Sequence, residues 1–177
     1  MYISSCMLFS EYYPDYFTAT ILEWKHLLKP EKYKEIIISS LEFLVKEQRI
    51  VVYAFCIMSS HIHVIWQVKQ GYKPKEIQLA FMKYTAQMII KDLRNNHKEV
   101  LEKFLVKAID RKYQVWERNA LSVALWTQAV FKQKLQYIHA NPVVAGLCGF
   151  PEDYKYSSAA FYEKGDSEWK FITHYSA

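Results

Sequence analysis

The stretch "IVVYAFCIMSSHIHVIWQV", residues 50–68, decides the fold because it predicts two strands that are neighbours in one sheet. Both halves are apolar and rich in β-branched and aromatic residues, which is typical of strands. Ser59 and Ser60 separate the halves and mark a tight turn. The stretch therefore predicts a β-hairpin with strands over 50–58 and 61–68.

Two histidines stand one residue apart in the second of these strands. Side chains alternate across a strand, so His61 and His63 share one face while Ile62 points to the other. Neutral imidazoles are good ligands for divalent ions such as Mn²⁺ and Zn²⁺. The same spacing also suits two half-buried histidines that are hydrogen-bonded within a sheet. The pair alone leaves both interpretations open, since a metal site needs further donors.

The segments on either side of the hairpin alternate between strand and helix patterns. Residues 16–24, "YFTATILEW", predict a strand. Residues 29–48 predict an amphipathic helix with Pro30 near its start, and residues 73–94 predict a second helix. Together these elements predict an α+β fold in which helices pack on one face of an antiparallel sheet.

The second half of the chain is less regular. Residues 100–122 predict a helix followed by irregular chain. Residues 125–141 predict a helix that ends at Asn141, because a proline disfavours the helical conformation in the residue before it. The tail beyond Gly146 predicts a short turn and then a strand or a helix.

Composition indicates an ordinary globular chain with a mild basic excess. The 177 residues suit one domain over 1–177, and 51% of them are hydrophobic, which excludes a disordered or fibrous protein. A net charge of +5 suits a polyanionic partner. Cys6, Cys56 and Cys148 form no CxxC pair, which indicates free thiols in a reducing compartment. With no apolar run long enough to cross a membrane, we expect a cytoplasmic protein without a membrane partner.

A second informative stretch is "QKLQYIHANPVVAGL", residues 133–147. On a helix Tyr137 and Asn141 face the same way, and Gln133 lies one turn earlier on that stripe. A tyrosine can act as a covalent nucleophile when a neighbouring cation compensates its phenolate, and an asparagine carbonyl oxygen is an acceptable metal ligand. The plainer interpretation is a core aromatic and a helix cap. His139 lies on a different face from Tyr137, which argues against a third histidine ligand.

Taken together, "HIH", "YIHANPVVAGL" and "PEDYKYSSAAFY" resemble the single-tyrosine HUH transposases of the REP-associated and insertion-sequence type, over residues 16–162. The resemblance implies a ferredoxin-like, or RRM-like, sheet with helices packed on it, as in HUH endonucleases. It also implies that His61 and His63 bind Mg²⁺ or Mn²⁺, that Tyr137 is the nucleophile, and that Asn141 or else Gln133 is the third ligand. Ser59-Ser60 departs from the Pro-Asn or Ser-Asn of many relatives.

The function implied by the resemblance is cleavage and rejoining of single-stranded DNA through a 5′-phosphotyrosine intermediate. The partner would be single-stranded or hairpin DNA, which would associate the protein with the nucleoid. Relatives include monomers and dimers, and we favour a homodimer. One alternative is a catalytically silent hairpin-DNA-binding protein derived from a transposase. Another is an unrelated metal-dependent hydrolase that uses His61 and His63 and does not need Tyr137.

A few other residues fit these functions on their chemistry alone. Tyr84 could replace Tyr137 as the nucleophile, although a packed helix aromatic is the simpler interpretation. Trp116 could stack on a base or fill the core. Phosphate contacts, or otherwise a solvated charged face, are predicted for a set of basic residues: Lys83, Lys91, Arg94, Arg111, Lys112 and Arg118.

Overall fold

The centre of the molecule is one antiparallel sheet. The computed structural model describes residues 13–165 and 168–176, so the predicted free thiol of Cys6 lies outside the described residues. The strands follow the spatial order β2-β3-β1-β4, and every neighbouring pair is antiparallel. Their bounds are β1 Asp15–Thr20, β2 Ile50–Ile57, β3 His61–Val68 and β4 Leu121–Ala124.

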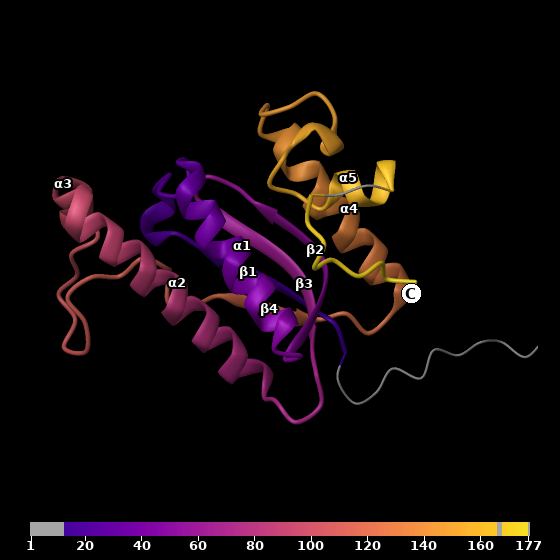
Figure 1. Ribbon diagram of the computed structural model, residues 1–177, viewed down its shortest axis with the longest axis horizontal. Helices are drawn as coiled ribbons and strands as arrows, with labels where there is room; N and C mark the ends of the chain where they lie inside the picture. The colour runs from indigo at the N-terminus through magenta and orange to yellow at the C-terminus, as the bar shows by residue number, and fades with distance from the viewer. Residues whose placement is uncertain (1–12, 166–167, 177) are drawn as a thin grey trace, which may run out of the picture.

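Two long helices connect the strands and lie together on one face of the sheet (Figure 1). Helix α1, Glu31–Lys46, follows β1, and α2, Pro74–Asn96, follows β3. The short α3, Lys98–Glu102, extends the second connection before β4. This element order with this strand order is the ferredoxin-like arrangement, which confirms the predicted fold class.

The predicted hairpin is present and places β3 in the middle of the sheet. The backbone N–H of Met58 donates to the carbonyl of His61 at 2.9 Å, which closes the turn around Ser59-Ser60. On β3, His63 pairs with Thr18 on one side and with Cys56 on the other. Since both of its edges are paired, the strand that carries the two histidines is held on both sides.

The two faces of the sheet have different chemistry. On the α1 and α2 face, Phe17, Ile62 and Trp66 are fully buried in the larger of two hydrophobic cores. On the other face, Tyr16 and Ile65 belong to a smaller core that also holds apolar residues of α4, Gln128–Val144. The prediction of helices on one face only is therefore wrong. Helix α4 packs on the second face because one of its stripes is apolar: Phe131, Leu135 and Ile138.

Helix α4 also runs further than predicted. It continues through Pro142 to Val144 instead of ending at Asn141. A proline removes one N–H, and with it only one bond of the helical ladder. Here that loss falls in the last turn, where the carbonyls of Asn141 and Pro142 accept from Ala145 and Leu147 at 3.0 and 2.9 Å. The buried ring of Pro142 packs against the body of the molecule, so tertiary contact outweighs the local preference.

Two strand predictions also need correction. Strand β1 ends at Thr20, and the chain then forms a 3-10 turn, η1 Leu22–Trp24, instead of extending to Trp24. Strand β4 was not predicted, because it has only four residues and three of them are exposed, so the sequence shows no apolar alternation there. Its existence depends on pairing with β1.

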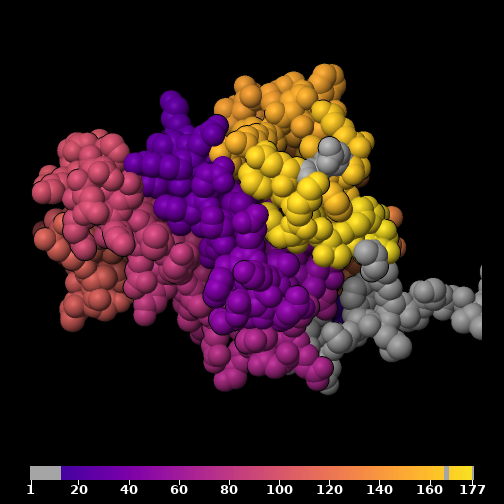
Figure 2. Space-filling model, viewed as in Figure 1, coloured from indigo at the N-terminus to yellow at the C-terminus, as the bar shows by residue number. Residues whose placement is uncertain are grey.

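The C-terminal segment covers the edge of the sheet that β2 forms. It contains a 3-10 turn, η2 Pro151–Asp153, and α5, Ala159–Lys164, so the predicted turn and helix are present. The N–H of Ser158 donates to Phe55 of β2 at 2.9 Å, and the N–H of Thr173 donates to Val52 at 2.9 Å. Figure 2 shows this yellow segment against the indigo surface of the N-terminal half. Within the described ranges, the chain contains no helix that is both long and apolar enough to cross a membrane.

Candidate active site

The two histidines lie side by side on the face of the sheet that α4 covers. Their ring centroids are 4.8 Å apart. His63 is buried, and His61, the first residue of β3, is half-buried. The predicted sharing of one face is confirmed, because Ile62 between them is fully buried in the opposite core.

Two hydroxyl groups from β1 fix the ring of His63. Its Nδ1 lies 2.8 Å from Thr18 Oγ1 and 2.9 Å from Tyr16 Oη, whereas its Nε2 is buried without a hydrogen-bond partner. A hydroxyl can accept from an Nδ1–H, and that tautomer leaves the lone pair on Nε2 free. Metal-binding histidines are oriented by the same kind of bond from the second ring nitrogen.

Burial keeps both imidazoles in the neutral form. The pKa of His63 falls to about 3, mainly because burial disfavours the charged ring and secondarily because a charged His63 would be repelled by positive charge on His61 or Lys134. Burial also lowers the pKa of His61. The Asn141 side chain opposes both shifts, because its oxygen could accept from a protonated ring, but it is a smaller effect than burial. Neutral imidazole is the form that binds a metal ion.

Asn141 rather than Gln133 faces the histidine pair. Its Nδ2 donates to the Tyr137 carbonyl at 2.8 Å, one helical turn earlier, and its side chain acts on the pKa of both imidazoles. With Nδ2 occupied in this way, the carbonyl oxygen Oδ1 is the atom left to face the rings. Gln133 is exposed and is not among the groups that shift the pKa of either histidine. Of the two alternatives for a third ligand, the structure brings together Asn141 and the histidines.

Tyr137 lies beside this group with its side chain half exposed. Its ring centroid is 5.5 Å from that of His63 and 6.3 Å from that of Tyr16. The Lys134 Nζ lies 5.5 Å from the Tyr137 ring centroid and 4.7 Å from that of Tyr16, so a cation stands beside both rings. Tyr84 is equally exposed, at 50%, but it belongs to α2 on the other side of the sheet. The core interpretation of Tyr137 is therefore wrong.

The donor set suits a divalent ion. Two neutral imidazoles and one amide oxygen supply three donors, and the buried, unpartnered Nε2 of His63 is a polar atom in need of a partner. Over residues 13–165 and 168–176, no group of three or more His, Cys, Asp or Glu side chains lies together. A third protein ligand at this pair would therefore have to come from another residue type, such as Asn141. Such a set leaves coordination positions open for water and phosphate oxygens.

His139, on the same helix, is separate from the site. Its Nε2 lies 2.8 Å from Ser158 Oγ, and its ring packs near Tyr162. Burial lowers its pKa to about 4. The prediction that it lies on a different helix face from Tyr137 is confirmed.

A strained turn borders the other side of the pair. Glu23 and Trp24 have φ values of 55° and 58°, in the left-handed region, which costs residues other than glycine about 1 kcal/mol or more each. The Trp24 ring centroid is 5.4 Å from that of His61, and the side chain is 61% exposed. The strain is therefore located beside the histidines.

Several residues of the site were not identified from the sequence. Lys134 had a usable signal, since it stands three residues before Tyr137 on the same helix. Tyr16 and Thr18 share a face by strand alternation, but only the pairing of β1 with β3 brings them to His63. Nothing in the local sequence signals the backbone of Trp24.

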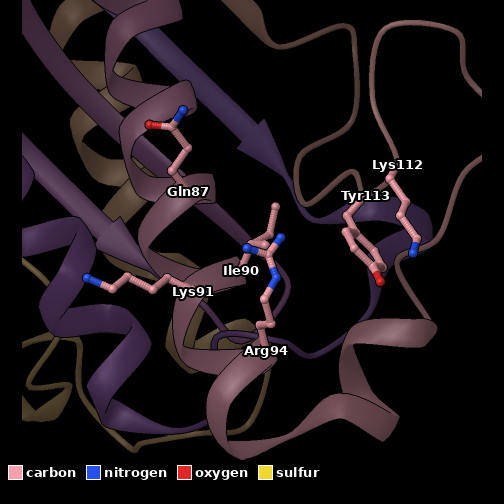
Figure 3. Close-up of a pocket in the computed structure, with 6 residues that line it drawn as sticks. All are labelled: Gln87, Ile90, Lys91, Arg94, Lys112 and Tyr113. Atoms are coloured by element: carbon pink, nitrogen blue, oxygen red, sulfur yellow. The ribbon is translucent and has the colours of Figure 1, made fainter.

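The basic residues predicted to contact DNA gather around α2 and the loop before β4. Arg94 and Lys112 line a pocket, with Arg94 on α2 and Lys112 and Tyr113 on the loop across from it (Figure 3). An adjoining depression is lined by Lys83, Arg111 and Arg118. Both arginines of the second group pair with Asp110, which offsets part of their charge. DNA contact by these residues stays a prediction.

Trp116 belongs to the core. It is 5% exposed, and its Nε1 donates to Thr85 Oγ1 at 3.0 Å. Because both its ring and its donor are occupied, the suggestion that it stacks on a base is wrong.

Comparison with known proteins identifies the fold. No protein-family model and no curated protein matches the sequence. Among solved structures, a REP-associated tyrosine transposase bound to a REP hairpin is similar with a TM-score of 0.64 and 17% identity, over 93% of this chain and 90% of that one. A protein from Deinococcus radiodurans R1, described as a candidate transposase, is similar with a TM-score of 0.51 and 11% identity, over 78% and 95%.

These likenesses show that the chain has the fold of the REP-associated tyrosine transposases. The fold agrees with the resemblance carried by the sequence motifs. A likeness in fold assigns no reaction to this chain, so its activity has to be inferred from its own residues.

Proposed function

We propose that this protein cleaves and rejoins single-stranded DNA, with Tyr137 as the nucleophile and a 5′-phosphotyrosine as the intermediate. The single observation that carries the proposal is the position of Tyr137, whose half-exposed ring lies 5.5 Å from that of the buried, neutral His63. The two residues come from different elements, α4 and β3, so the fold itself assembles the pair. A solvent-accessible phenol beside two metal-competent imidazoles suits attack on a phosphodiester.

The reaction balances without an energy source. The Tyr137 hydroxyl loses its proton as its oxygen bonds to phosphorus, the bond from phosphorus to the 3′ oxygen breaks, and that oxygen takes up a proton. The DNA 5′ end is then held on the tyrosine as a phosphodiester. Because this bond keeps the phosphodiester energy, a 3′-hydroxyl can attack it, restore the phenol and join two strands.

Individual residues of the chain have separate roles in this proposal. Lys134 favours the developing phenolate, since its ammonium lies 5.5 Å from the Tyr137 ring centroid. Thr18 and Tyr16 hold the ring of His63 in position through Nδ1. His61, His63 and Asn141 would hold Mg²⁺ or Mn²⁺. When bound, such an ion polarises the phosphate and offsets its charge.

The proposed substrate is single-stranded DNA next to a hairpin. The similar transposase is bound to a REP hairpin, and the present chain has a net charge of +5, which suits a polyanion. The basic residues around α2 offer phosphate contacts away from the histidine pair. We propose that the protein acts in the cytoplasm, at the nucleoid. We also propose that it is a homodimer.

The test is the formation of a covalent adduct. The protein is incubated with Mn²⁺ and labelled single-stranded DNA that carries a hairpin from the sequences flanking its gene, and the products are separated on a denaturing gel. The wild type is expected to form a protein–DNA adduct that EDTA prevents and that Tyr137→Phe abolishes. Tyr84→Phe, a change at an equally exposed tyrosine, is the matched control and should behave as the wild type.

Other outcomes would contradict the proposal in distinguishable ways. Tight hairpin binding without an adduct from the wild type would indicate a silent DNA-binding protein. Metal-dependent cleavage that survives Tyr137→Phe would indicate a hydrolase in which the histidine pair works without the tyrosine.

A further inference from the structure

We propose that Trp24 is a stacking platform for the base of the nucleotide immediately 5′ of the cleaved bond. This inference rests on the proposed function and adds to it the residue that positions the strand on the leaving-group side. Trp24 is 61% exposed, although it is a large aromatic side chain in direct contact with the His61 ring.

The backbone around Trp24 is firmly held even though its side chain faces solvent. The N–H of Trp24 donates to Ile21 at 2.8 Å, and the N–H of Glu23 donates to the Glu117 carboxylate at 2.7 Å. On either side of the turn, the N–H groups of Ile21 and Leu28 donate to the carbonyls of Ser60 and Ser59, at 2.8 and 2.9 Å. The turn is thus tied to the hairpin that carries His61.

This anchoring maintains an unfavourable conformation. Glu23 and Trp24 both adopt positive φ, which neither side chain favours, in consecutive positions. A strained backbone that presents an exposed ring to a reactive site, instead of burying it, is accounted for if the ring contacts the substrate. An aromatic face of this kind binds bases with little regard to sequence, since every base has a π-face.

The order of the rings assigns the side of the cut. Tyr137 lies against His63, and Trp24 lies against His61. The ring centroids of the two histidines are 4.8 Å apart on β3, so the pair stands between the nucleophile and the tryptophan. In an in-line displacement the attacking and leaving oxygens lie on opposite sides of phosphorus. A phosphate held at the histidine pair and attacked by Tyr137 therefore releases its 3′ oxygen towards Trp24.

The DNA strand can continue beyond Trp24 in the same direction. Residues next to Trp24 bond to the segment before β4, where the N–H of Leu22 donates to Val115 at 2.8 Å and the N–H of Glu117 donates to Thr20 at 2.8 Å. The same segment, from Val115 to Arg118, borders the depression beside α2, whose lining includes Lys83, Arg111 and Arg118 as well as Asp110 and Glu117. DNA that leaves the site past Trp24 would thus reach cationic side chains.

The test combines abasic substrates with variants of the tryptophan. Adduct formation is measured for the wild type, Trp24→Ala and Trp24→Phe, on DNA with a base or an abasic residue immediately 5′ of the cut. We expect Trp24→Ala to raise the half-saturating DNA concentration about ten- to a hundredfold, with an unchanged single-turnover rate at saturation. Trp24→Phe should keep most of the affinity. The abasic residue should raise the half-saturating DNA concentration of the wild type by the same factor. It should not change that of Trp24→Ala.

A second tryptophan provides the matched control. Trp126 is similarly exposed, at 64%, but it follows β4 at the opposite end of β1 from Thr20 and His61. Trp126→Ala should keep the full abasic penalty. Circular dichroism of each variant verifies that it is folded.

The possible failures are separable. If the wild type forms the adduct and the abasic penalty is the same with and without the Trp24 ring, the platform is wrong and the proposed function stands. If an abasic residue on the 3′ side of the cut, instead of the 5′ side, causes the loss of affinity that depends on Trp24, the assigned direction is wrong. If the wild type forms no adduct, the proposed function fails and the platform falls with it.

Discussion

The two faces of the central sheet are built by the same strands and differ in almost every other respect. Ile62, on the α1 and α2 face, is fully buried among apolar side chains. His61 and His63, its neighbours in the chain, point with Tyr16 and Thr18 towards α4, which carries Tyr137. The comparison teaches that the larger core lies on one face, while the other, with its smaller core, can also carry polar and partly unsatisfied groups.

The largest difference should appear when a histidine of the polar face is removed. His63→Ala is expected to lower the rate of adduct formation by roughly a thousandfold, because loss of the proposed metal ligand would remove several kcal/mol of charge stabilisation. His139→Ala, a change at another buried imidazole, on α4, should leave the rate of the folded protein within a few fold. Single-turnover kinetics with Mn²⁺ measure both. Equal losses would mean that burial, not chemistry, explains His63.

The hydroxyls behind His63 should have an intermediate effect. The double substitution Tyr16→Phe and Thr18→Val removes both partners of Nδ1 but keeps the shapes of the side chains. We expect about a ten- to hundredfold loss of Mn²⁺ affinity, since the bonds behind a ligand fix its tautomer and orientation. Calorimetric titration of the metal measures this. An unchanged affinity would show that the two hydroxyls do not orient the ring.

A substitution on the α1 and α2 face should lower the free energy of unfolding and leave the cleavage rate unchanged. Ile62→Val removes one methylene from a fully buried side chain and is expected to cost about 0.5–1.5 kcal/mol of unfolding free energy. Urea denaturation measures the loss. The cleavage rate of the folded protein should not change, even though His61 and His63 flank the substitution. A large fall in that rate would show that the two faces are not independent.

Low pH should lower the free energy of unfolding by an amount similar to that for Ile62→Val, because of the buried histidines. The pKa values of His63 and His139 fall to about 3 and about 4, from 6.5. As the pH falls below 6.5, the unfolded chain takes up protons at these sites that the folded chain does not bind, so stability is lost with falling pH. The expected loss is on the order of 1 kcal/mol per pH unit for each histidine.

Urea denaturation at pH 7 and pH 5 measures this dependence. His139→Gln should remove one share of it and leave the share of His63. A stability that does not change over this range, in the wild type, would contradict the neutral, desolvated state assigned to both rings.

The features predicted from the sequence are those that depend on local periodicity. Strand alternation was enough to place His61 and His63 together, and helical spacing was enough to place Tyr137 with Asn141. The features that were missed depend on contacts between distant segments. Thr18 reaches His63 only through strand pairing, β4 exists only beside β1, and the helix continues past Asn141 because Pro142 is buried. The turn at Trp24 is held by Glu117, a residue far along the chain.

The most direct test of the account is to locate the DNA on the protein. The covalent adduct is digested with nuclease and protease, and mass spectrometry identifies the residue that carries the remaining nucleotide. The account predicts a phosphodiester on Tyr137, beside the histidines of the polar face. A nucleotide on Tyr84, on the other side of the sheet, or on any other residue would contradict it.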